Sequence, residues 1–225
     1  MLLRLADNRD PSSLASRLRA KRNFWFQSLA HAFPRPFTVL DVGGTETVWK
    51  TIGFANKQEI KITILNVVPT EVSYDNVSFV LGDGRNMHQF EEKQFDVVYS
   101  NSVIEHVGDY ADIRRMAEEV RRVGKRYFLQ TPNRYFPIEP HFVFPFFQFL
   151  PRVLQTALVQ NFSLGWIERK ERWDQAAQEV ESIRLLSYGE LSSLFPDGKI
   201  EREKIFGLTK SLIAHKMSIS SQNWR

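Results

Sequence analysis

An acidic residue followed by paired glycines is the feature of this chain with the clearest chemical meaning. The apolar run FTVLDV contains Asp41 and passes directly into Gly43 and Gly44. A strand that ends in a glycine turn lets a ligand approach the backbone, because no Cβ stands in the way. A carboxylate beside the turn suits a ligand with an ammonium or another positive centre and disfavours a pyrophosphate. The turn therefore predicts a site for a positively charged cofactor.

Small and polar residues follow four other strand-like segments in the same way. They are Asn66, the run Gly82-Asp83-Gly84-Arg85, the run Ser100-Asn101-Ser102 and the run Gln130-Thr131-Pro132-Asn133. In open parallel sheets, ligands bind beyond the carboxyl ends of the strands. We therefore expect these residues to meet the Asp41 turn along one edge of a sheet.

Two histidines near these strand ends could remove a proton from a substrate. His106 follows the fourth strand-like segment in IEHV, and His141 lies in PIEPHF, two residues after Glu139. Imidazole titrates near neutral pH, so both are candidate bases. The alternative for His106 is a polar side chain packed at a helix start. Together with Glu105 these side chains are of metal-binding type, but their spacing matches no recognised motif, and we predict no metal.

The segments that position these residues alternate between two patterns. Short apolar runs predict strands at 37–42, 61–66, 77–81, 95–100 and 126–131. Helical spacing predicts helices at 13–33, 110–123 and around 187–195. Nearly continuous apolar strands separated by helices indicate a parallel sheet covered on both faces. The last two strand-like runs, IEREKIFG and KSLIAHK, are too close for a parallel crossover. We expect a single doubly wound, mostly parallel α/β sheet of seven strands with an antiparallel C-terminal pair.

The segment 132–175 breaks this rhythm. It holds five of the ten prolines and seven of the 18 phenylalanines, which is too much proline for a core strand and too aromatic for a disordered linker. We interpret it as a cap inserted over the carboxyl edge of the sheet, ending in a helix near Val153 and Leu158. The cap could bind an apolar substrate. The alternatives are a dimer interface, a simple cap core, or a membrane-surface contact made together with the leading helix.

The composition indicates one soluble domain over residues 1–225. Its 43% hydrophobic and 25% charged residues are ordinary, and no apolar run is long enough to span a membrane. The absence of cysteine excludes disulfides, thiolate metal sites and a cysteine nucleophile. The N-terminus MLLRLADNRD acquires charges too early for a secretory signal, which favours the cytoplasm. Two basic clusters are interpreted as solvated helix faces, with no nucleic-acid partner: Arg17, Arg19, Lys21 and Arg22, and Arg121, Arg122, Lys125 and Arg126.

With these motifs in order, the chain resembles the class I S-adenosylmethionine-dependent methyltransferases, and more narrowly their type-11 group. The resemblance spans roughly residues 37–133 and rests on VLDVGGT, VLGDGRNM, FDVVYSNSVIEHV and TPNR. It implies the Rossmann-like methyltransferase fold and S-adenosylmethionine as the cofactor.

The resemblance also assigns cofactor contacts to residues at the strand ends. The turn after the first strand would hold the methionine end, and the acid after the third strand would accept a hydrogen bond from the adenine amino group. The backbone after that acid would meet the edge of the ring, and the residues after the fourth strand would lie under the sulfonium. The predicted contacts are Asp41, Gly43, Gly44, Thr45, Asn66, Asp83, Gly84, Arg85, Asn101 and Ser102.

Two departures from the family pattern fall in this site. The family has further glycines two and four residues after its first, where this chain has Thr45 and Thr47. It also has an acid at the end of the second strand for the ribose hydroxyls, where this chain has Asn66. An amide can bond a diol more weakly than a carboxylate can, and Glu71 is a less favoured substitute.

Together these features predict methyl transfer from S-adenosylmethionine to a small-molecule acceptor by a monomer or homodimer, with His106 and His141 as catalytic candidates. Whether an O, N or C atom is methylated stays open, as do acceptors related to glycans, lipids or quinones. A nicotinamide-dependent oxidoreductase is disfavoured because the turn lacks G-x-G-x-x-G. The departures also keep open a non-catalytic cofactor-binding or scaffold protein on the same fold.

Overall fold

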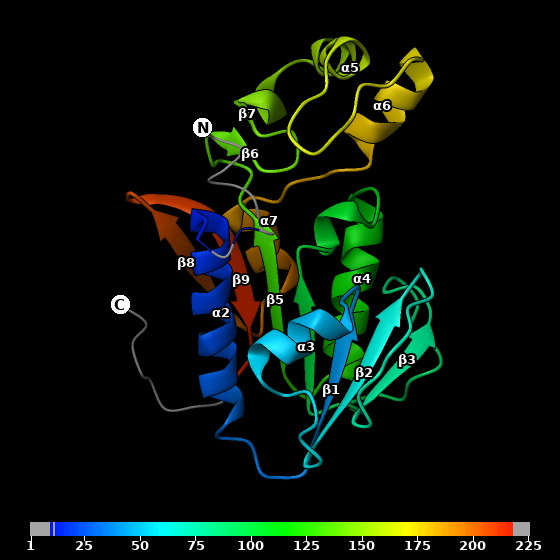
Figure 1. Ribbon diagram of the computed structural model, residues 1–225, viewed down its shortest axis with the longest axis vertical. Helices are drawn as coiled ribbons and strands as arrows, with labels where there is room; N and C mark the ends of the chain where they lie inside the picture. The colour runs from blue at the N-terminus through cyan, green and yellow to red at the C-terminus, as the bar shows by residue number, and fades with distance from the viewer. Residues whose placement is uncertain (1–9, 11, 218–225) are drawn as a thin grey trace.

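A computed structural model describes residues 10 and 12–217 (Figure 1). Its centre is a seven-stranded sheet with the strand order β3-β2-β1-β4-β5-β9-β8. The strands are β1 (Phe37–Val42), β2 (Ile60–Asn66), β3 (Val77–Leu81), β4 (Val97–Asn101), β5 (Tyr127–Pro132), β8 (Lys199–Ile205) and β9 (Leu208–His215). Strands β1 to β5 are parallel, and β9 runs antiparallel to both β5 and β8. The predicted sheet with its antiparallel C-terminal pair is confirmed.

Helices cover both faces of the sheet, as expected. The helices α2 (Leu14–Ala30) and α3 (Glu46–Ile52) pack on one face, and α4 (Tyr110–Val123) and α7 (Tyr188–Leu194) pack on the other. Successive residues of a strand point to opposite faces. In β1, Val39 therefore packs in the core under α2 and α3, and Leu40 packs in the core under α4 and α7. Side-chain caps fix the starts of α2, α4 and α7; in α2, for example, Ser13 Oγ accepts a hydrogen bond from the backbone N–H of Ser16.

Two strand connections lack the helix that strict alternation predicts. Residues 67–76 and 82–96, which join β2 to β3 and β3 to β4, form turns, bridges and loops. The first loop is instead held by Glu46 of α3, whose carboxylate accepts hydrogen bonds from the backbone N–H groups of Ser73 (2.6 Å) and Tyr74 (2.9 Å). Strand β3, which these two loops flank, forms one edge of the sheet.

The cap between β5 and α7 is a small unit with a core of its own. It contains the hairpin β6 (Ile138–Glu139) and β7 (Phe144–Pro145), and the helices α5 (Arg152–Asn161) and α6 (Trp173–Glu181). Its buried core is Phe142, Phe147, Val159, Ala176 and Val180. Figure 1 shows it beyond the carboxyl end of β5. Our boundary at residue 175 falls inside α6, whose apolar spacing continues through Val180, so the insertion is longer than predicted.

No helix in the described part of the chain combines the length and apolarity needed to cross a bilayer. The prediction that residues 1–10 lack a secretory signal lies outside the described residues, apart from residue 10.

Candidate active site

The acid at the end of β1 is buried behind the glycine turn. The carboxylate of Asp41 accepts a hydrogen bond from Trp49 Nε1 at 2.8 Å, and its Oδ1 has no partner in the described ranges 10 and 12–217. Burial raises the pKa of Asp41 to about 7, and the Trp49 hydrogen bond opposes only part of that shift. A Cβ at Gly44 would lie 1.8 Å from Asp41 Oδ2. Position 44 must therefore be glycine because the Asp41 carboxylate occupies the space that a Cβ would need. A cofactor contact by Asp41 stays a prediction.

The rest of the turn is held by its neighbours. Gly43 has φ +76°, and a Cβ there would come within 2.6 Å of the Val103 side chain. Asn66 donates from Nδ2 to the carbonyl of Gly44 at 3.2 Å, so the amide at the end of β2 already braces the turn. Thr45 is the N-cap of α3, and its side chain makes no capping bond, which leaves the hydroxyl for a ligand.

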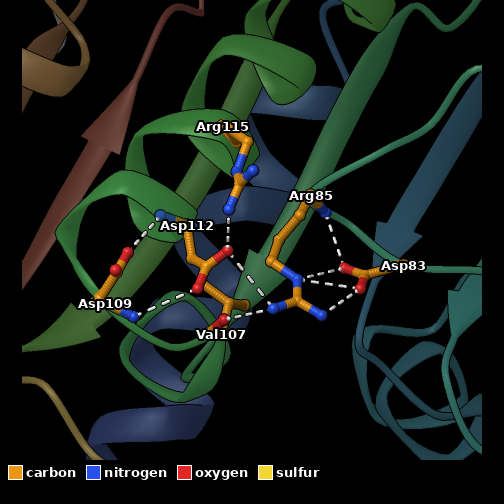
Figure 2. A network of polar contacts seen from close by, with 6 residues as sticks. All are labelled: Asp83, Arg85, Val107, Asp109, Asp112 and Arg115. Atoms are coloured by element: carbon orange, nitrogen blue, oxygen red, sulfur yellow. Dashed lines mark hydrogen bonds and ion pairs between the residues drawn. The ribbon is translucent and has the colours of Figure 1, made fainter.

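The acid at the end of β3 is engaged by an arginine two residues later (Figure 2). Arg85 Nη2 lies 2.5 Å from Asp83 Oδ2, and its Nε donates to both carboxylate oxygens. The same guanidinium reaches the carbonyl of Val107 and the carboxylate of Asp112. The hydrogen bond from Arg85 lowers the pKa of Asp83, which keeps it ionised as an acceptor. Bonding to an adenine amino group, as predicted, would require Asp83 to share this carboxylate with Arg85.

The end of β4 carries a strained residue and an unpartnered oxygen. Ser102 has φ +55°, a conformation that non-glycine residues rarely adopt, and its Oγ donates to Gln130 Oε1 at 2.9 Å. The neighbouring Asn101 Oδ1 is buried without a hydrogen-bond partner. Strain and an orphaned acceptor at adjacent positions favour a ligand-binding role for this strand end.

The structure brings together two Glu–His pairs that are distant in sequence. The rings of His106 and His141 lie 4.7 Å apart and nearly perpendicular. Glu105 is fully buried; its Oε2 accepts a hydrogen bond from Thr131 Oγ1 at 2.9 Å, and its Oε1 has no partner. Glu139 is also buried and lies 2.7 Å from His141 Nδ1. Sequence spacing could not reveal this cluster, because the hairpin β6–β7 folds back onto the loop after β4.

These contacts shift the pKa values of the group in different directions. Burial raises the pKa of Glu105 to about 7. Desolvation and the neighbouring His141 lower the pKa of His106 to about 4, although the residue is exposed. Burial alone would lower the pKa of His141, but the hydrogen bond with Glu139 raises it overall. At neutral pH His106 is therefore the neutral imidazole that a proton acceptor must be.

A cavity of about 570 Å³ adjoins Ser102 and His141. Its apolar wall includes Pro132, Phe136, Ile138, Val143 and Trp166. Three basic side chains, Arg19 and Arg22 of α2 and Lys210 of β9, also line it. The interpretation of Arg22 as part of a solvated helix face is wrong: the residue is buried, and its Nη1 lies 3.1 Å from Glu203 Oε1. Sequence reasoning missed this basic wall because its members come from opposite ends of the chain.

Comparison with known proteins supports the sequence resemblance. Residues 40–127 match a family model described as a methyltransferase domain. Uncharacterized proteins from two strains of Mycobacterium tuberculosis are 41% identical over 56 residues, a match that covers 25% of this chain. The match spans only 19% of the length of those curated relatives.

Solved structures share the fold at low sequence identity. The CurJ carbon methyltransferase superposes with a TM-score of 0.58 at 10% identity, covering 91% of this chain and 55% of that one. A SAM-dependent methyltransferase from Methanosarcina mazei gives 0.54 at 14% identity, covering 84% and 97%. Residues 40–127 thus match a methyltransferase domain, and the chain as a whole shares the fold of solved methyltransferases, which supports the predicted class I methyltransferase.

Proposed function

We propose that this protein transfers a methyl group from S-adenosylmethionine to a small-molecule acceptor bound in the cavity beneath the cap. The observation that carries the proposal is the position of Ser102. This residue is the last of the polar strand-end residues that are predicted to bind the cofactor, and its side chain also lines the cavity. A methyl donor and an acceptor would thus meet at the carboxyl end of β4.

The polar groups along this edge fit such a cofactor. The ionised, part-exposed carboxylate of Asp83 and the orphaned Asn101 Oδ1 are acceptors for amino and positively charged groups, and the Thr45 hydroxyl is uncommitted to its helix. S-adenosylmethionine supplies a sulfonium-bound methyl group with an excellent leaving group. The protein must therefore mainly align the acceptor, exclude water and accept a proton. His106, neutral and beside the cavity-lining His141, is suited to the last task.

The cavity favours an acceptor with an apolar body and a negatively charged group. Its apolar wall matches a ring or a chain, whereas Arg19, Arg22 and Lys210 favour an anion. Within the described part of the chain, three buried donors in this wall have no hydrogen-bond partner: Arg19 Nε, Arg22 Nε and Ser211 Oγ. A carboxylate or phosphate on the acceptor would satisfy them.

Calorimetric titration tests the cofactor assignment. We expect S-adenosylmethionine to bind and NAD not to bind, and Asp83→Ala to weaken the binding at least about tenfold by removing a charged acceptor. Asp174→Ala is the matched control, because Asp174 also pairs with an arginine two residues away but is itself exposed, on α6 of the cap. Binding of NAD alone would overturn the proposal. Binding without formation of S-adenosylhomocysteine across a panel of anionic acceptors would favour the scaffold alternative.

The tip of the β8–β9 hairpin gives a second test. Ile205 pairs with Leu208 across a two-residue turn of Phe206 (φ +47°) and Gly207 (φ +81°), and Phe206 lines the cavity while 96% exposed. Two positive φ values define a turn that prefers Asn-Gly. We expect Phe206→Asn to raise the free energy of unfolding by about 1 kcal/mol and to raise KM for the acceptor with kcat unchanged.

Denaturation and steady-state kinetics check both effects of Phe206→Asn. The control is Phe162→Asn, which removes another exposed phenylalanine, outside the turn, and should give no gain in stability. A loss of stability in Phe206→Asn would contradict the turn argument, and an unchanged KM would remove Phe206 from the acceptor site.

A further inference from the structure

We propose that Glu105, His106 and His141 bind one divalent transition-metal ion such as Zn²⁺ at the edge of the acceptor cavity. One carboxylate oxygen and one ring nitrogen from each histidine lie within 4.8 Å of one another. A tetrahedral ion with ligand distances of about 2.1 Å needs its ligand atoms roughly 3.4 Å apart. Small side-chain rotations would close the cluster to that spacing.

The buried oxygen of Glu105 is suited to bind a cation. Its Oε2 is satisfied by Thr131, but Oε1 is buried with no hydrogen-bond partner among the described residues, in a side chain that is 0% exposed. A buried carboxylate oxygen without a partner is strongly disfavoured, whereas a coordinated cation would satisfy it. The two histidines bring their ring nitrogens to the same place.

Outer contacts orient each ligand as they do in known metal sites. Glu139 Oε1 lies 2.7 Å from Nδ1 of His141. The other oxygen of Glu139 accepts hydrogen bonds from the backbone N–H groups of His141 and Phe142. This leaves His141 Nε2 for a cation. The backbone of Ser182 hydrogen-bonds the ring of His106. A carboxylate or carbonyl on the far nitrogen of a metal-binding histidine fixes its orientation and increases its basicity.

The donor set selects the ion and leaves room for chemistry. Two imidazoles and one carboxylate suit Zn²⁺ and related transition metals, whereas Mg²⁺ prefers oxygen ligands alone. Three protein ligands leave a fourth position open, as in catalytic zinc sites. Because His141 lines the cavity and His106 is exposed, an ion can enter from that side. This role rests on the proposed function: the open position would orient an oxygen or nitrogen of the methyl acceptor. A histidine that holds the metal would then not act as the base.

Metal titration of the full chain tests this site without any acceptor. Protein stripped with a chelator is titrated with ZnCl₂ and with MgCl₂ by calorimetry, and its metal content is measured after desalting. We expect one Zn²⁺ per chain, no Mg²⁺, and a rise in the thermal midpoint with Zn²⁺. Glu105→Gln, which keeps an acceptor for Thr131, and His141→Ala should each weaken Zn²⁺ binding at least about tenfold. His88→Ala, at an exposed histidine outside the cluster, should not.

The outcomes separate this proposal from the methyltransferase proposal. No stoichiometric Zn²⁺ in the wild-type protein, or equal binding in Glu105→Gln and His141→Ala, would overturn the metal site. X-ray absorption of the wild-type complex should show mixed nitrogen and oxygen ligands at about 2.0–2.1 Å, so the test stands even if a variant folds poorly. If Zn²⁺ binds but S-adenosylmethionine does not, the proposed function fails and the metal site stands. If the cofactor binds and Zn²⁺ does not, the reverse holds.

Discussion

Replacing Asp41 with asparagine is expected to stabilise the protein above neutral pH, by about 2–4 kcal/mol at pH 8. In the folded chain, burial raises the pKa of Asp41 to about 7 from an ordinary value of 3.8. Of the residues that the structure describes, Trp49 alone donates to this carboxylate, through Nε1 to Oδ2, and Oδ1 has no donor. Asparagine keeps the shape and an acceptor for Trp49 but carries no charge to desolvate.

The direction of the pH dependence follows from the protons bound in each state. Between about pH 4 and pH 7 the folded state holds a proton on Asp41 that the unfolded state has lost. Stability of the wild-type protein therefore falls as pH rises through this window and is lowest, as far as this group is concerned, above pH 7. The asparagine variant lacks that contribution, so the two proteins should be similar near pH 4 and diverge towards pH 8.

Chemical denaturation at several pH values between 5 and 8 measures the difference. Asp96→Asn is the matched control, because the pKa of Asp96 is lowered overall: hydrogen bonds from Lys125 and Thr38 outweigh its burial. That control should lose stability at pH 8. An Asp41→Asn variant that is no more stable than wild type at pH 8 would show that the buried charge is compensated.

The same group separates a structural role from the predicted cofactor contact. If a positive centre of S-adenosylmethionine lies near Asp41, binding at pH 6 should release a proton, because the charge favours the carboxylate. Calorimetry in buffers of different ionisation enthalpy detects that proton. Cofactor binding with no proton release would leave Asp41 as a support for the Gly44 turn only.

The fold was predictable because local patterns and sheet rules agree along most of the chain. The predicted strand at 37–42 matches β1, and a capping residue and a glycine bound the helix Tyr110–Val123, with Asp109 before it and Gly124 after it. The ends of parallel strands necessarily meet at one edge, so the polar residues after β1 to β4 were placed correctly as a group. What they touch was not predictable, since Arg85 and Trp49 engage the two acids.

The contacts of the site that could not be predicted join segments far apart in sequence. The Glu139–His141 pair reaches the loop after β4 only because the β6–β7 hairpin folds back, and neither spacing nor composition encodes that distance. Arg22 looked like one charge in a basic helix. Its burial depends on Glu203, which is 181 residues away and faces it from β8.

Replacing Glu203 with glutamine is expected to lower the free energy of unfolding by about 3–5 kcal/mol. Arg22 Nη1 lies 3.1 and 3.2 Å from the two oxygens of Glu203, and both side chains are buried. Arg19 and Lys210 line the same cavity. Without the carboxylate, three cationic groups would share a poorly solvated wall with no compensating charge.

Arg22→Met is the informative partner to Glu203→Gln. Removing Arg22 leaves Glu203 with Lys210 nearby, so we expect a smaller loss than in Glu203→Gln, although each change breaks the same ion pair. Burial lowers the pKa of Lys210 and the Glu203 carboxylate opposes that shift. In Glu203→Gln, Lys210 should therefore lose its proton more readily, and the loss of stability should be larger at pH 6 than at pH 9.

Inorganic phosphate at low concentration should stabilise Glu203→Gln more than wild type, compared with chloride at equal ionic strength. Equal losses in the two variants, with no response to phosphate, would show that the basic wall does not act as an anion site.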